Sequence, residues 1–163
     1  MTVCPRTKLR MMTPEEAARS FPHLLEEDLL VPLLVTGGSM VPFLRHRRDV
    51  VYIRGIRYQS PRVGDVILFC REGGQALVLH RVLSRYADGS FQVGGDAQTW
   101  TEVVRPEQIL GVVTWLSRNG GKAFPARRLD QRALWGLWWV LRPWRPQLLR
   151  WAARVHKKRA SAP

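Results

Sequence analysis

Short apolar runs rich in β-branched and aromatic residues lie in the middle of the chain, and they limit its fold more than any other feature. The runs cover residues 33–35, 49–53, 65–69, 76–83, 91–93 and 109–115. Turn-forming residues separate them, in the pairs Gly37-Gly38, Gly64-Asp65, Gly73-Gly74, Asp88-Gly89 and Gly94-Gly95. Runs of this length with such frequent turns are typical of strands. No spacing repeats along the chain, so the pattern predicts one compact, mainly β domain rather than a repeat protein.

The segments on either side of this region have helical patterns. Thr13-Pro14-Glu15-Glu16 has the cap, the first-turn proline and the acidic residue of a helix start. Near the other end, Leu134, Trp138 and Leu141 recur at helical spacing, and a second amphipathic segment follows the prolines of residues 142–146. We therefore expect three parts: an N-terminal helical segment in residues 1–30, a β domain in residues 31–118, and a basic, Trp-rich helical tail in residues 119–163.

Positive charge is concentrated at the C-terminal end. Of the net charge of +13, residues 127–159 carry +9, with ten basic residues and Asp130 as the one acid, which leaves +4 for residues 1–126. Such a segment binds polyanions. Tryptophan and arginine at helical spacing favour an anionic membrane surface as the partner and argue against nucleic acid. The alternative is that the first helix packs its tryptophans on the β domain and the rest is a solvated basic end.

No segment has the pattern of a membrane span. The longest run without a charged residue, 29–44, has 16 residues and contains two prolines and two glycines, whereas a spanning helix needs about 20 apolar residues. Residues 1–10 lack the apolar core of a secretory signal. We expect a cytoplasmic or peripheral membrane protein.

One serine lies within a motif of known chemistry. The stretch Thr36-Gly37-Gly38-Ser39-Met40-Val41-Pro42 resembles the nucleophile motif G-x-S-M-x-P of the signal peptidase I and LexA-like serine peptidases. Five later stretches are similar, in chain order, to further elements of that family: Asp49–Val51, Val63–Phe69, Leu79–Val82, Gly95–Ala97 and Ile109–Val113. The resemblance covers roughly residues 33–116. It implies a LexA/signal peptidase-like β fold and a serine endopeptidase that cleaves a leader- or signal-like peptide or preprotein.

A serine nucleophile needs a neighbouring base. Many members of this family use lysine, but this chain has no lysine between positions 9 and 121, which argues against a Ser-Lys dyad. The resemblance to the archaeal and endoplasmic-reticulum branch places His80 at the base position. An unperturbed imidazole titrates near pH ~6.5 and is largely neutral at pH 7, so it can accept a proton.

The resemblance also supplies the acid that would orient the imidazole. Asp96 matches the family's acid, and Glu102 stands where the family often has a second aspartate. We predict a site of Ser39, His80 and Asp96, with Glu102 as a possible second acid. The backbone N–H groups of Gly38 and Ser39 are the predicted oxyanion donors, and Met40 is expected to line the substrate pocket. No pattern in the sequence predicts a metal or a cofactor.

Two departures from the family pattern bear on activity. Gly37 stands where many relatives have a hydroxyl residue that helps to stabilise the oxyanion, and Ala97 stands where they have asparagine. Loss of one oxyanion donor can cost about 2.7–4 kcal/mol of transition-state stabilisation. Slow or partner-dependent activity would follow.

Two other classes of function remain open at this point. Taken singly, Ser39, His80 and Asp96 each have an ordinary structural explanation, as turn or packed residues, so the β domain could be a non-catalytic peptide-binding or membrane-surface scaffold module. A LexA-like regulator is the other class. It is weakened because residues 1–30 contain no complete helix-turn-helix pattern and because the lysine base is missing.

Overall fold

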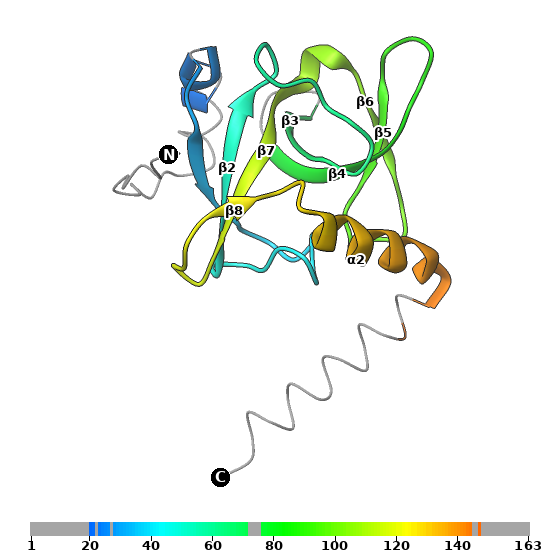
Figure 1. Ribbon diagram of the computed structural model, residues 1–163. Coiled ribbons are helices and arrows are strands. Elements are labelled where there is room, and N and C mark those ends of the chain that lie inside the picture. Colours follow the sequence, from blue (N-terminus) through cyan, green and yellow to red (C-terminus); the bar gives the residue numbers. More distant parts are fainter. Residues whose placement is uncertain (1–19, 22, 27, 72–75, 145–146, 148–163) are drawn as a thin grey trace.

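The computed structural model describes residues 20–21, 23–26, 28–71, 76–144 and 147 (Figure 1). The predicted helix start at Thr13 and the second amphipathic segment after residue 147 lie outside the described residues. Residues 20–21 and 23–26 are helical. Phe21 and Leu25, one helical turn apart, are 3% and 4% exposed and pack into the core.

The described chain is mainly β, as the sequence predicts: eight antiparallel strands form one sheet. The strands are β1 (Val31–Leu34), β2 (Asp49–Gly55), β3 (Val66–Cys70), β4 (Leu77–Arg85), β5 (Phe91–Gly94), β6 (Glu102–Val104), β7 (Ile109–Arg118) and β8 (Phe124–Pro125). Their order in the sheet is β1-β2-β7-β3-β4-β5-β6, and β8 pairs with β7 on the side of this path. Each of the six predicted runs corresponds to one of these strands.

The sequence pattern did not predict two of the strands. β6 has three residues and β8 has two, including Pro125, so neither is long enough to show alternation. β8 pairs with Trp115 and Leu116 of β7. The sheet therefore extends past residue 118, where the sequence analysis placed the start of the helical tail.

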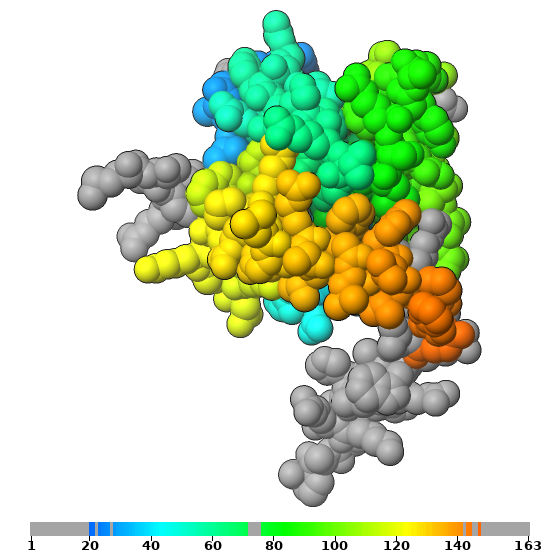
Figure 2. All heavy atoms as spheres, turned by 45° about the vertical axis from the view of Figure 1, so that its right-hand side comes forward, coloured from blue at the N-terminus to red at the C-terminus, as the bar shows by residue number. Residues whose placement is uncertain are grey.

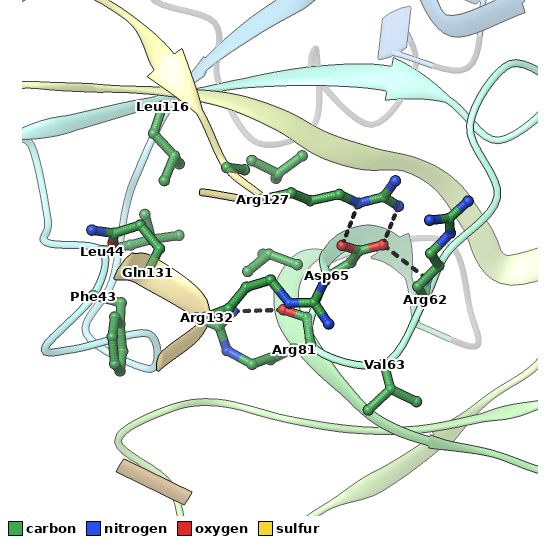
Figure 3. Close-up of a pocket in the computed structure, with 14 residues that line it drawn as sticks. Phe43, Leu44, Arg62, Val63, Asp65, Arg81, Leu116, Arg127, Gln131 and Arg132 are labelled. Carbon is green, nitrogen blue, oxygen red and sulfur yellow. Dashed lines mark hydrogen bonds and ion pairs between the residues drawn. The ribbon is translucent and has the colours of Figure 1, made fainter. Parts of the chain in front are cut away.

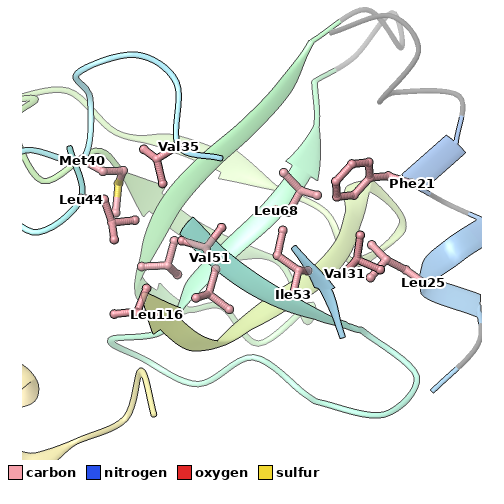
Figure 4. Packing of buried hydrophobic residues seen from close by; sticks show 12 residues of the cluster. Phe21, Leu25, Val31, Val35, Met40, Leu44, Val51, Ile53, Leu68 and Leu116 are labelled. Atoms are coloured by element: carbon pink, nitrogen blue, oxygen red, sulfur yellow. The ribbon is translucent and has the colours of Figure 1, made fainter. Parts of the chain in front are cut away.

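The sheet bends and encloses two clusters of buried side chains. Register shifts between Tyr52 and Ile53 in β2, in β3 and in β4 bend the strands locally. β3 is buried on both faces, with Leu68 in the first cluster and Phe69 in the second. The first cluster, shown in Figure 4, is Phe21, Leu25, Val31, Val35, Met40, Leu44, Val51, Ile53, Val66, Leu68, Val113 and Leu116. The second is Ile67, Phe69, Val82, Phe91, Val93, Val104, Ile109 and Val112.

Two helical elements follow the sheet. α2 (Leu129–Val140) is the helix that the sequence predicts around Leu134, and it lies along one end of the β body (Figure 1). η2 (Arg142–Trp144) is a single turn at the predicted proline break, and η1 (Pro106–Gln108) leads into β7. In the part of the chain described here, no helix has the length and apolar character needed to cross a bilayer.

Candidate active site

Ser39 lies in the loop between β1 and β2. Gly37 has a φ of 83°, in the left-handed region that favours glycine, and its N–H donates to His46 Nδ1 at 3.0 Å. Farther along the loop, Leu44 N–H donates to Met40 O at 2.9 Å, and both of these side chains are 2% exposed. The loop is therefore anchored to the first cluster. Met40 is a core residue and lines neither of the pockets described below, so its predicted place in a substrate pocket gains no support.

The turn after β5 holds this loop against the strands. Ala97 N–H donates to Ser39 O at 2.8 Å. The register of β4 and β5 pairs Arg81 with Gly94, so the next residue, Gly95, comes opposite His80. Cross-strand neighbours project to the same side of a sheet. A Cβ at Gly95 would lie 2.6 Å from Ser39 O, so Ser39 lies beside the position from which the His80 side chain projects.

The reactive groups of the Ser39 loop are unengaged. Within the described part of the chain, the Ser39 hydroxyl has no hydrogen-bond partner, and the N–H groups of Gly38 and Ser39 donate to no acceptor. A hydrogen bond from Ser39 to His80 is accordingly not formed in this state. Catalytic hydrogen bonds often tighten only when substrate is present. These two N–H groups are the ones that the sequence analysis predicts as oxyanion donors.

His80, the predicted base, is buried. The residue is 1% exposed and packs between the rings of Phe69 and Trp100, at centroid distances of 5.9 and 5.8 Å. This burial is the largest cause that lowers the pKa of His80, and the charge of Arg71 lowers the pKa further, while Glu102 acts in the opposite direction. The imidazole is therefore neutral at pH 7, the form that accepts a proton.

Glu102 is the acid in contact with this imidazole. Its Oε1 lies 2.9 Å from His80 Nδ1. The contact is off the direction of the Nδ1–H bond, so it is electrostatic, and the buried Nδ1 has no well-formed hydrogen bond to any described residue. Arg71 holds the same carboxylate through two hydrogen bonds of 2.9 Å, and its guanidinium lies 5.6 Å from the Trp100 ring centroid. These four residues, which we call the His80 network, form one connected group.

Asp96, the acid that the sequence prediction favoured, pairs with a different residue. Both of its carboxylate oxygens accept from Arg81, at 2.8 and 2.6 Å, and both side chains are buried. Arg81 also donates to Gly64 O, and Trp138 Nε1 donates to the Asp96 backbone O at 2.7 Å. Asp96 has the smallest of the stated influences on the pKa of His80. The structure therefore brings Glu102, not Asp96, into contact with the predicted base.

Sequence reasoning missed Arg71, Trp100 and Trp138. Strand alternation was the one available signal: His80 and Arg81 are consecutive residues of β4, so their side chains lie on opposite faces of the sheet. A single carboxylate in the turn after β5 could therefore not contact both side chains. The aromatic and arginine contacts depend on tertiary packing and leave no local pattern.

Two pockets adjoin these groups. The larger, of about 70 Å³, has an apolar floor that includes Leu44 and Leu116 and a rim that includes Arg62, Arg127 and Arg132 (Figure 3). Asp65 at its edge pairs with Arg127 at 2.9 and 2.5 Å. The smaller, of about 10 Å³, is lined by Leu83, Gly94, Gly95, Asp96, Gln98, Trp100, Thr101 and Trp139.

Among the described residues, no group of His, Cys, Asp and Glu side chains is arranged to hold a metal ion. Comparison with known protein families finds no family model that matches the chain. Comparison with curated proteins finds no match either. Function therefore has to be argued from the geometry of the site.

Proposed function

We propose that the chain is a serine endopeptidase of the signal peptidase type, with Ser39 as nucleophile, His80 as general base and Glu102 as the acid beside the base. One observation carries the proposal: a buried, neutral imidazole has a carboxylate 2.9 Å from Nδ1. By the register of β4 and β5, this imidazole projects from the position opposite Gly95, which lies against Ser39 O. The sequence put Asp96 in the place of this acid. Asp96 instead holds the turn and Arg81 together.

The residues divide the reaction as follows. His80 takes the proton of the Ser39 hydroxyl as Oγ forms a bond to the scissile carbonyl carbon, and the N–H groups of Gly38 and Ser39 donate to the oxyanion. Glu102 stabilises the imidazolium that results. The imidazolium then gives its proton to the leaving amine as the C–N bond breaks. Water, activated by His80, hydrolyses the acyl-enzyme and restores Ser39.

The substrate that fits the proposal is an extended peptide, leader- or signal-like, that lies along a strand edge near the site. β6 is an edge strand of the sheet path and carries Glu102. The pocket of about 10 Å³ beside Gly95 and Trp100 is too small for a large side chain. We place this activity in the cytoplasm or at a membrane surface, because the basic end of the chain suits an anionic bilayer.

Peptide cleavage tests the assignment. Purified full-length protein is incubated with a library of leader-like peptides, and products are identified by mass spectrometry. Ser39→Ala and His80→Ala should each lower the rate to background. The matched controls are Ser60→Ala and His23→Ala, both at exposed positions, and these should cleave as the parent does. Equal cleavage by the parent and the two site variants would refute the proposal.

A non-catalytic peptide-binding module is the second candidate. The absence of a hydrogen bond from the Ser39 hydroxyl to any described residue and the departure at Gly37 favour it. Such a module would bind peptides with the same affinity before and after Ser39→Ala and would release no product on long incubation.

A further inference from the structure

α2 carries a stripe of uncovered apolar side chains. Leu129, Ala133, Leu137 and Val140 recur at spacings of four, four and three residues, and thus share one side of the helix. Leu129 is 84% exposed, Leu137 58% and Val140 68%. We call these four residues the α2 stripe. Figure 2 shows the helix, in orange, on the surface of the molecule.

The opposite side of α2 is docked, so the stripe is fixed in an outward direction. Trp138 Nε1 donates to Asp96 O at 2.7 Å, and its ring packs edge-on against Phe43 at 6.5 Å. The ring of Trp135 lies 5.5 Å from the Arg81 guanidinium. In these contacts the tryptophans of α2 face the β body, and its leucines and its valine face solvent.

Positive charge lies on α2 next to the stripe, at Arg132, and across the larger pocket from α2, at Arg62. Arg132 in α2 and Arg62 across the larger pocket are exposed (Figure 3) and make no ion pair with any described residue. The nearby acids are already used, since Asp65 pairs with Arg127 and Asp130 with Arg128. The excess continues along the chain, because residues 127–159 hold a net +9.

We propose that the α2 stripe and the arginines beside it form a surface that binds a bilayer containing anionic phospholipids. Apolar side chains on a helix that lies in the interface enter the boundary between headgroups and acyl chains, and arginines pair with the phosphates. Charge complementarity favours this partner, because an apolar stripe near arginines that make no ion pair with a described residue complements an anionic lipid surface. The inference is independent of the proposed peptidase activity.

Vesicle flotation with the full chain tests the surface. The protein should float with vesicles of phosphatidylcholine and phosphatidylglycerol and remain unbound with phosphatidylcholine alone, and added salt should weaken binding. Leu137→Glu should lower the partition coefficient at least about tenfold. Arg132→Gln should lower it about fivefold, as expected for one charge near an anionic surface.

Val103→Glu is the matched control, because Val103 is 57% exposed on β6, away from the stripe, and its variant should bind vesicles as the parent does. Circular dichroism and thermal unfolding of each variant establish that the fold is retained. The proposal is overturned if Leu137→Glu and Val103→Glu bind equally well. It is also overturned if sedimentation velocity shows that the stripe joins two copies of the chain and that Leu137→Glu separates them.

Discussion

His80 and Arg81 are neighbours in β4, yet they lie in two different networks on opposite faces of the sheet. Arg81 makes two short hydrogen bonds to Asp96, and rings of Phe43 and Trp135 lie within 5.3 and 5.5 Å of its guanidinium. Among the described residues, His80 contacts one acid, Glu102, and its Nδ1 has no well-formed hydrogen bond. Both carboxylate oxygens of Asp96 accept hydrogen bonds from Arg81, as expected of a pair that stabilises the fold. The His80 network instead contains an imidazole that can gain or lose a proton.

The largest expected effect is a loss of folding stability when the Arg81–Asp96 pair is broken. Asp96→Ala would leave the buried Arg81 guanidinium without its carboxylate, and loss of one partner of a buried pair costs about 3–5 kcal/mol. We expect urea unfolding to show a loss of this size. Asp28→Ala is the control, because Asp28 pairs with Arg54 in the same two-bond manner at the surface, and its loss should be far smaller. Equal losses would show that the Arg81–Asp96 pair has no special structural role.

Glu102→Gln tests the His80 network, the proposed catalytic group. The amide keeps the shape of the side chain but cannot stabilise an imidazolium, so kcat/KM for peptide cleavage should fall about 100-fold or more. Urea unfolding should shift less than it does for Asp96→Ala, because Glu102 is 22% exposed. If activity is retained in Glu102→Gln and lost in folded Asp96→Asn, the roles of the two acids are the reverse of those assigned above.

Gly95→Ala tests the link between the turn after β5 and the Ser39 loop. The new Cβ would lie 2.6 Å from Ser39 O, and the loop would have to move. Misplacement on the order of 1 Å at a catalytic group can cost about 100-fold in rate, so we expect kcat to fall about 10- to 100-fold with a smaller change in KM. Gly136→Ala is the control, because a Cβ at that position would have no described atom within 4 Å apart from its chain neighbours and the backbone of its own helix. An unchanged kcat in Gly95→Ala would contradict the placement.

The smallest expected effect is a dependence of folding stability on pH that arises from His80. Burial lowers the pKa of His80 in the folded state, whereas the unfolded chain titrates near ~6.5. The unfolded state therefore binds more protons between these two pKa values. The stability due to neutral His80 is fully present above pH ~6.5 and is lost as the pH falls through the folded pKa. Unfolding measured against pH should show this loss in the parent and lack it in His80→Gln.

The activity profile has the same origin. In the proposed mechanism only neutral imidazole accepts the Ser39 proton, so the acid limb of kcat/KM should lie below pH ~6.5. The ring protons of His80, followed by NMR, should titrate with the same midpoint. An acid limb that lies above pH ~6.5 would point to a different base.

The sequence predicts the long strands well and the contacts poorly. The runs at 49–53 and 109–115 are rich in β-branched and aromatic residues, and both form strands, β2 and β7, that pair with each other, because this composition is a local property of the sequence. The choice between Asp96 and Glu102 was different. It depended on which face of β4 each acid meets, and β6, which carries Glu102, is only three residues long. Trp138 contacts Asp96 over 42 residues of separation, a contact that no local pattern contains.

Covalent labelling of Ser39 tests the central claim most directly. A fluorophosphonate probe forms a bond between phosphorus and a serine Oγ, with loss of fluoride, only where a base has activated the hydroxyl. Intact-mass and peptide-mass measurements should find one adduct at Ser39 in the parent and none in His80→Ala. An unlabelled Ser39 in the folded parent, or equal labelling of the parent and His80→Ala, would contradict the account.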